Sequence, residues 1–197
     1  MAAYPFLVEV AWEVLTQFLA DWQENPYRWS KEIDIQAELA TRLDKVYRLL
    51  GRGMVLANYK NVIAGFEGKQ FWSRVCCAPT VQCQWKGEPV RCYPDVAVLD
   101  DIPDPNSPPD TNEAGRFPLL WACEIKLDAP SDDAQSPEGW NDLAKMTTLL
   151  KQDRARYACL VTMFRRRADS GTGIQWDRKE ERLWQCTAEL QPLVPTS

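Results

Sequence analysis

The chain has 197 residues, carries a net charge of −5 and contains no histidine. This length suits one domain with a substantial hydrophobic core, and the missing histidine excludes His-based catalytic triads, Cys–His proteases and His-ligated metal sites. The acidic balance also argues against a free-standing, sequence-indifferent nucleic-acid binder, because such proteins are usually basic.

Two amphipathic helices are predicted near the N-terminus. Residues 5–24 have apolar side chains at the spacing i, i+3, i+4, i+7, which is typical of a packing helix. A second helix is predicted from Ser30, a suitable N-cap, to about Leu50. Its first turn contains Glu32, where an acidic side chain suits the helix dipole.

The middle of the chain predicts strands separated by turns. Short apolar runs at 54–59, 70–76 and 80–85 are separated by Gly and Pro. Residues 91–99 and 119–127 predict buried strands, because both are rich in Val, Ile, Leu or Trp. We expect one of the three earlier runs to pair beside the 91–99 strand.

The acidic segment 101–117, rich in Pro and Asp, is predicted to be a surface loop. It is either functional or an insertion tolerated at a hairpin tip. Residues 95–137 hold ten acids and two bases, a local charge of −8, whereas residues 138–187 hold ten bases and seven acids, a local charge of +3. The first balance suits a metal site, and the second suits contact with a phosphate backbone.

A helix at 138–156, a strand at 157–164 and a terminal hairpin of 174–176 with 183–186 are predicted in the last third of the chain. Three arginines directly follow the predicted strand: Arg165, Arg166 and Arg167. They are a candidate contact for phosphate, and a solvated turn is the alternative.

The seven cysteines favour reduced, buried thiols over a disulfide framework, because their number is odd and most lie inside apolar runs. No second Cys/His pair accompanies Cys76, Cys77 and Cys83, so a zinc site is not expected. The sequence has neither an apolar run of about 18 residues nor a basic-then-apolar leader. We therefore expect a soluble, cytoplasmic protein that does not associate with membranes.

Three charged residues interrupt the two predicted buried strands. Asp95 lies in the first strand, and Glu124 and Lys126 lie in the second. Glu124 and Lys126 project from the same face, because side chains alternate along a strand. A buried charge is costly unless it is paired or bound to a metal, so these residues indicate either a functional site or a set of strand-end ion pairs.

Pro94-Asp95, followed 29 positions later (124 − 95) by Glu124-Ile125-Lys126, resembles the PD-(D/E)XK nuclease motif. In that motif a Pro-Asp on one strand faces a Glu-x-Lys on the next. The resemblance covers roughly residues 30–164, where a helix precedes the two strands and a helix and a strand follow them. It implies an α/β fold with a restriction-endonuclease-like three-layer core, in which helices flank a central mixed β-sheet in the order α-β-β-β-α-β, as a single domain of residues 1–197.

The resemblance also implies metal-dependent hydrolysis of phosphodiesters. Asp95 and Glu124, with the main-chain carbonyl of Ile125, would ligate Mg²⁺ or Mn²⁺. Lys126 would position and help deprotonate the attacking water, or stabilise charge on the phosphate.

The first helix of this family usually contributes a glutamate to the metal site, here Glu32 or Glu38. Glu32 is preferred, because it falls near the centre of the apolar stripe of its helix, whereas Glu38 falls roughly 100° away. The alternative is that both are solvated helix acids.

Two function classes stay open. The first is an endonuclease, for DNA in preference to RNA, that uses residues 165–167 to contact nucleic acid. Because no DNA-reading module is recognisable, a protein partner, a homodimer or the structure of the nucleic acid would select its target. The second is a non-enzymatic nuclease-fold subunit that binds other proteins. The intact set of Asp95, Glu124 and Lys126 favours the nuclease, and analogy of fold suggests a role in defence.

Overall fold

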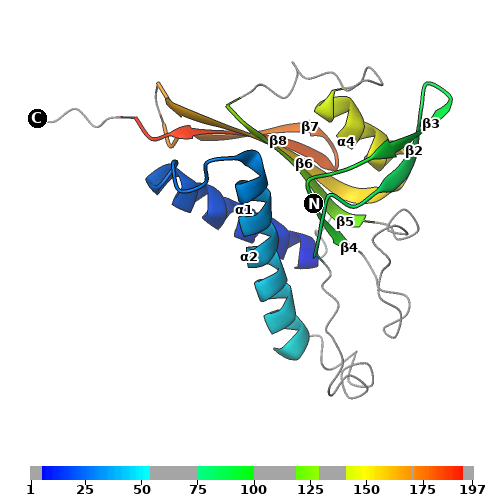
Figure 1. Ribbon diagram of the computed structural model, residues 1–197, viewed down its shortest axis with the longest axis horizontal. Helices are drawn as coiled ribbons and strands as arrows, with labels where there is room; N and C mark the ends of the chain where they lie inside the picture. Colours follow the sequence, from blue (N-terminus) through cyan, green and yellow to red (C-terminus); the bar gives the residue numbers. More distant parts are fainter. Residues whose placement is uncertain (1–5, 54–74, 100–118, 129–140, 170, 193–197) are drawn as a thin grey trace, which may run out of the picture.

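A six-stranded mixed sheet with the strand order β1-β4-β5-β6-β8-β7 forms the centre of the computed structural model, which describes residues 6–53, 75–99, 119–128, 141–169 and 171–192 (Figure 1). The strands of this sheet are β1 (Val75–Cys77), β4 (Val96–Leu99), β5 (Leu119–Leu127), β6 (Ala155–Arg167), β7 (Ile174–Glu180) and β8 (Leu183–Leu190). β5 and β6 pair in parallel, as do β6 and β8, and the other neighbours are antiparallel. The short strands β2 (Val81–Trp85) and β3 (Glu88–Cys92) form a separate antiparallel hairpin.

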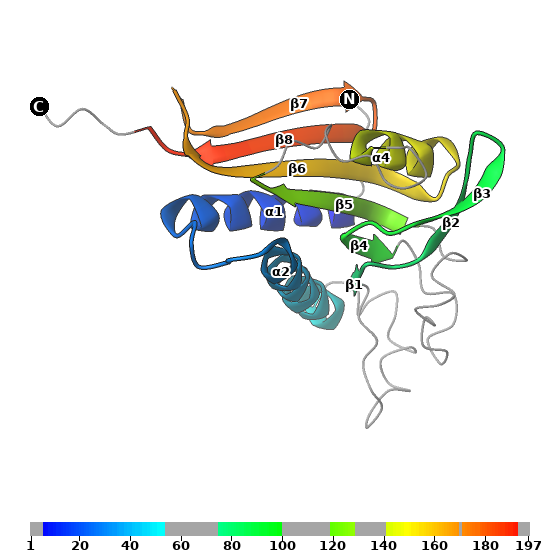
Figure 2. The same ribbon diagram turned by 45° about the horizontal axis from the view of Figure 1, so that its top comes forward.

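Helices cover both faces of the sheet, as Figure 2 shows: α1 (Phe6–Glu24) and α2 (Glu32–Gly53) lie on one side and α4 (Asp142–Lys151) on the other. Alternation along the strands divides the core in two. Trp121 and Cys123 of β5 belong to the cluster that contains the buried side chains of α1 and α2. Ala122, between them, belongs to the cluster that contains the buried side chains of α4. The α/β class and the mixed sheet are therefore confirmed.

Several predicted elements agree closely with the structure. The helix predicted at 5–24 corresponds to α1, and the strand predicted at 119–127 is β5. β1 supplies the expected neighbour of β4, with Cys77 paired to Val96. The predicted terminal hairpin is present as the antiparallel pair β7 and β8, with longer strands than expected.

The single strand predicted at 91–99 is wrong. β3 ends at Cys92 and β4 begins at Val96, and the two strands belong to different sheets. Pro94 lies in the gap and has no N–H to donate to a strand ladder. The main-chain carbonyl of Asp95 accepts a hydrogen bond from the Ala78 amide at 2.9 Å, so this break is a defined feature of the chain.

The predicted helix at 138–156 is too long at its C-terminal end. α4 ends at Lys151, Gln152 is its C-cap and Asp153 adopts a positive φ of 51°. Residues 155 and 156 belong to β6, which extends the strand predicted at 157–164 in both directions. The turn after Lys151 therefore separates helix from strand earlier than the apolar spacing indicates.

The apolar run at 54–59 and the acidic loop at 101–117 lie outside the described residues. Six of the cysteines are described and have free thiols, of which only Cys77 is exposed. The expectation of buried thiols is thus wrong for Cys77, which lies at the end of the three-residue strand β1. Within the described ranges, no helix is long and apolar enough to cross a membrane.

Candidate functional site

The strand register sets Asp95 and Glu124 close to each other. β4 pairs with β5 in the antiparallel sense as far as Val96 and Cys123. Continuing this register by one residue would set Asp95 opposite Glu124. The Glu124 side chain projects to the face of the sheet that α4 covers, because it alternates with Cys123 and contacts Lys145. Its carboxylate lies close enough to that of Asp95 for the two charges to interact.

Beyond Val96, two carboxylates occupy the edge of β5 that β4 leaves unpaired. Asp95 Oδ2 accepts a hydrogen bond from the Ile125 amide at 2.7 Å. Glu32, at the first position of α2, accepts one from the Leu127 amide through Oε2 at 3.3 Å. Main-chain donors that a longer β4 would have used are therefore directed at acidic side chains from two different elements.

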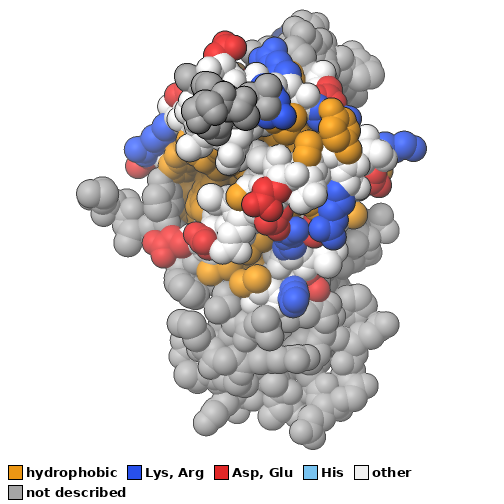
Figure 3. Space-filling view, turned by 90° about the vertical axis from the view of Figure 1, so that its left-hand side faces the viewer, with side chains coloured by type: hydrophobic (Ala, Val, Ile, Leu, Met, Phe, Trp, Pro, Cys, Tyr) orange, Lys and Arg blue, Asp and Glu red, His pale blue; other side chains and the backbone are white. Residues whose placement is uncertain are grey.

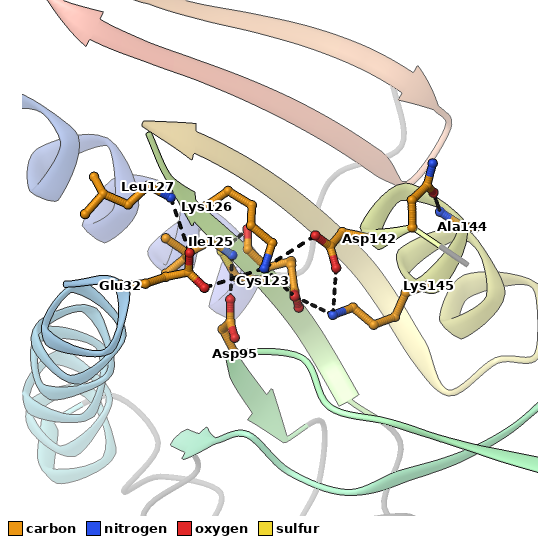
Figure 4. Close-up of polar contacts among 11 residues, drawn as sticks. Glu32, Asp95, Cys123, Ile125, Lys126, Leu127, Asp142, Ala144 and Lys145 are labelled. Atoms are coloured by element: carbon orange, nitrogen blue, oxygen red, sulfur yellow. Dashed lines mark hydrogen bonds and ion pairs between the residues drawn. The ribbon is translucent and has the colours of Figure 1, made fainter. Parts of the chain in front are cut away.

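Two lysines and two carboxylates form a closed ring of ion pairs on the α4 face (Figure 4). Lys126 Nζ lies 3.5 Å from Glu124 Oε1 and 3.4 Å from Asp142 Oδ2. Lys145 Nζ lies 3.0 Å from Asp142 Oδ1 and donates a hydrogen bond to Glu124 Oε1. Each carboxylate thus contacts both ammonium groups. Lys126 Nζ is also 3.5 Å from Glu32 Oε1, which connects the ring to α2.

The sequence does not identify Asp142 and Lys145 as site residues. Asn141 is the N-cap of α4 and accepts a hydrogen bond from the Ala144 amide at 2.8 Å, which fixes where the helix begins. Residues 142 and 145 then lie on one side of the first turn. An Asp-x-x-Lys pair after an N-cap is a common surface ion pair, so only its position over β5 distinguishes it.

The ring is largely withdrawn from solvent. The Glu124 side chain is 3 % exposed, and those of Lys126, Lys145 and Asp142 are 18 %, 14 % and 12 % exposed. Glu124 Oε2 is buried and has no hydrogen-bond partner in the described part of the chain. Leaving a buried acceptor unsatisfied costs about 1–3 kcal/mol, so a purely structural arrangement would normally pair this oxygen with a donor.

Burial weakens the acidity of the Glu124 and Asp95 carboxyls. Burial raises the pKa of Glu124 to about 8, and the Asp95 charge adds to this effect. Burial likewise raises the pKa of Asp95 to about 6, although the Ile125 amide opposes it. Burial alone would lower the pKa of Lys126, but Glu124 and the other nearby carboxylates outweigh it and raise that pKa above its usual value. Lys126 is therefore held as an ammonium ion.

The structure thus brings together Glu32, Asp95, Glu124, Ile125 and Lys126, all of which the sequence predicts as site residues. Glu38 does not join them and instead pairs with Arg42 of the same helix at 2.8 Å. Among the described residues, no three Asp, Glu, Cys or His side chains are arranged as a ready-made metal-binding group. In Figure 4 the ammonium group of Lys126 lies between Glu32 and Asp142, so lysines take the positions between the carboxylates.

The three arginines at the end of β6 have partners within the protein. Arg165 pairs with Asp128 at 2.9 Å, and Arg166, whose side chain is 68 % exposed, pairs with Glu189 at 2.6 Å. Arg167 donates to the main-chain carbonyl of Gln191. On the end of the molecule seen in Figure 3, basic and acidic side chains are interspersed. Contact of these arginines with nucleic acid stays a prediction.

Comparison of the chain with models of protein families, with curated proteins and with solved structures finds no match.

Proposed function

We propose that this protein is a divalent-metal-dependent nuclease that hydrolyses phosphodiester bonds, in DNA in preference to RNA, with Asp95, Glu124 and Lys126 at its active site. The observation that carries the proposal is the buried oxygen Oε2 of Glu124, which has no hydrogen-bond partner among the described residues. The Glu124 carboxylate also lies close enough to Asp95 for their charges to interact. A buried carboxylate oxygen without a proton donor is suited to a metal ion.

The composition of the cluster fits a divalent cation. Glu32, Asp95, Glu124 and Asp142 supply four carboxylates and Lys126 and Lys145 supply two ammonium groups, which leaves 4 − 2 = 2 negative charges when all are ionised. Mg²⁺ or Mn²⁺ would neutralise this excess, and both ions prefer oxygen ligands.

The main chain of β5 is also oriented suitably. Ile125 directs its N–H to Asp95 at the unpaired edge of the strand. The N–H and C=O of one strand residue point to the same side, so the Ile125 carbonyl faces this edge too. Asp95, Glu124 and the Ile125 carbonyl would therefore hold the ion, with Glu32 completing the shell.

The bound ion would supply Lewis-acid stabilisation of the phosphate and lower the pKa of a bound water. Lys126, kept positively charged by the carboxylates around it, is suited to stabilising negative charge on the phosphate rather than to removing a proton. Lys145 donates its hydrogen bond to Oε1 of Glu124, so Oε2 stays available to the ion. Asp142 holds both lysines in place.

The connectivity of the chain supports the same proposal. The elements α2, β1, β4, β5, α4 and β6 occur in the order α-β-β-β-α-β, and the four strands are adjacent in the order β1-β4-β5-β6. This is the arrangement expected of a restriction-endonuclease-like core, with β8 and β7 added to one edge of the sheet. A protein partner or the structure of the nucleic acid would then select the target.

A second candidate is a non-enzymatic subunit with the same fold. The observation that favours it is the closed ring itself, because Lys126 and Lys145 compensate Glu124 and Asp142 without any ion. In that case Asp95 and Glu32 would serve only to satisfy the edge of β5.

Cleavage assays distinguish the two candidates. Circular, linear and single-stranded DNA and RNA are incubated with the protein in Mg²⁺, Mn²⁺ or EDTA. We expect metal-dependent cleavage of DNA, a loss of at least about 100-fold in Glu124→Gln and wild-type rates in the control Glu38→Gln. Failure of the wild-type protein to cleave any of these substrates would favour the non-enzymatic subunit.

A further inference from the structure

Arg165 joins the linker between α1 and α2 to the end of β6. Its side chain is 20 % exposed. The guanidinium donates hydrogen bonds to three main-chain carbonyls of the linker: Trp29 at 2.8 Å, Ser30 at 3.1 Å and Pro26 at 3.3 Å. These contacts fix the segment that leads directly into Glu32.

The same guanidinium also fixes the end of β5. Arg165 Nη1 lies 2.9 Å from Asp128 Oδ2, and the Arg165 amide donates to Asp128 Oδ1 at 2.8 Å. Asp128 has a positive φ of 57°, a left-handed conformation that aspartate tolerates better than most residues other than glycine. Its amide donates to the Met163 carbonyl at 2.8 Å. The chain therefore has a defined conformation immediately after Leu127.

Arg165 thus contacts the chain close to both partners of the hydrogen bond between Glu32 and Leu127. Ser30 lies two residues before Glu32, and Asp128 lies one residue after Leu127. We propose that Arg165 is a positioning residue that places the Glu32 carboxylate at the edge of β5. Only arginine suits this role, because its planar group presents five donors at once, whereas lysine presents a single flexible ammonium group.

This inference rests on the proposed function only for its consequence, which is a contribution of Glu32 to metal binding. The position of Glu32 itself is measurable without a metal, because the Leu127 amide donates a hydrogen bond to its carboxylate. The Ile125 amide, which donates a hydrogen bond to Asp95, serves as an internal reference on the same strand.

The experiment compares amide hydrogen exchange by NMR in the metal-free wild-type protein, Glu32→Ala, Arg165→Gln and the double variant. We expect exchange at Leu127 to accelerate about fivefold to tenfold in both single variants, with no further acceleration in the double variant and little change at Ile125. Arg165→Lys, a milder change, should give an intermediate acceleration. Arg42→Gln is the matched control, because Arg42 is 23 % exposed and joins α2 to α1 through Asp21, with Glu38 of α2 as its second partner. It should destabilise the protein while leaving exchange at Leu127 unchanged.

A second readout is the affinity for Mn²⁺, which should fall about 10- to 100-fold in Arg165→Gln, to the level of Glu32→Ala, and remain at the wild-type value in Arg42→Gln. An Arg165→Gln protein with lower stability but wild-type exchange at Leu127 would overturn the inference and leave Arg165 a purely structural residue. Absence of Mn²⁺ binding by the wild-type protein would refute the proposed function instead, and the exchange data would still decide the role of Arg165.

Discussion

Replacing Glu124 with glutamine should change how the stability of the metal-free protein depends on pH. Burial and the neighbouring Asp95 raise the pKa of Glu124 from 4.5 to about 8. Between these two values the folded protein retains a proton that the unfolded chain has lost. The free energy of unfolding of the wild-type protein therefore falls as the pH rises through this window, and the destabilising contribution is complete above about pH 8.

The size of the effect follows from the shift. One pKa unit corresponds to about 1.4 kcal/mol, so Glu124 should lower the free energy of unfolding by on the order of 3 kcal/mol between about pH 5 and pH 8. Asp95, whose pKa is raised to about 6, adds a smaller decrease of the same sign at lower pH. Glu124→Gln should remove most of the decrease above pH 6, because its amide does not titrate.

Urea unfolding at a series of pH values measures this dependence. The matched control is Glu38→Gln, which removes a carboxylate that pairs with Arg42 outside the ring. It should retain the wild-type decrease. An identical pH dependence in wild-type protein and Glu124→Gln would refute the reasoning, because Glu124 would then be ionised in the folded state without penalty.

Three further predictions concern the two lysines of the ring and Arg166. Lys126→Ala should reduce cleavage by about two to four orders of magnitude in single-turnover kinetics, while thermal unfolding still shows stabilisation by the metal. Cleavage at the wild-type rate would instead make Lys126 only a counter-ion of Glu124. Lys145→Met should raise the affinity for Mn²⁺ by about tenfold in calorimetric titration, because it removes the positive charge that contacts Glu124 Oε1. Weaker binding would indicate that Lys145 orients the Glu124 carboxylate instead. Arg166→Ala should weaken binding of DNA and reduce its dependence on salt concentration, with a smaller effect on the chemical step, whereas unchanged binding would remove Arg166 from the nucleic-acid surface.

The sequence predicts the strand-borne part of the site because that part depends on local patterns. β5 is a continuous apolar run, so charges at positions 124 and 126 stand out and their shared face follows from strand alternation. The helical spacing around Glu32 likewise distinguishes it from Glu38, and the structure brings Glu32, not Glu38, to Lys126.

The remainder depends on tertiary contacts that leave little trace in the sequence. Asp142 and Lys145 form an ordinary i, i+3 pair, and their importance arises only because α4 packs over β5. The break at Pro94 depends on β3 joining a hairpin with β2 rather than the main sheet. Arg165 lies in a run of three arginines that predicts phosphate contact, yet its guanidinium binds the linker before α2.

Titration of Mn²⁺ into wild-type protein and Asp95→Asn, followed by calorimetry in buffers of different ionisation enthalpy, tests the central claim most directly. We expect the wild-type protein to bind the ion and to release protons near pH 7, because the carboxyls of Glu124 and Asp95, with pKa values of about 8 and 6, must be deprotonated to act as ligands. Asp95→Asn should keep the fold and lose this binding by at least about 100-fold. Equal affinity and equal proton release in the two proteins would contradict the assignment of this carboxylate cluster as a metal centre.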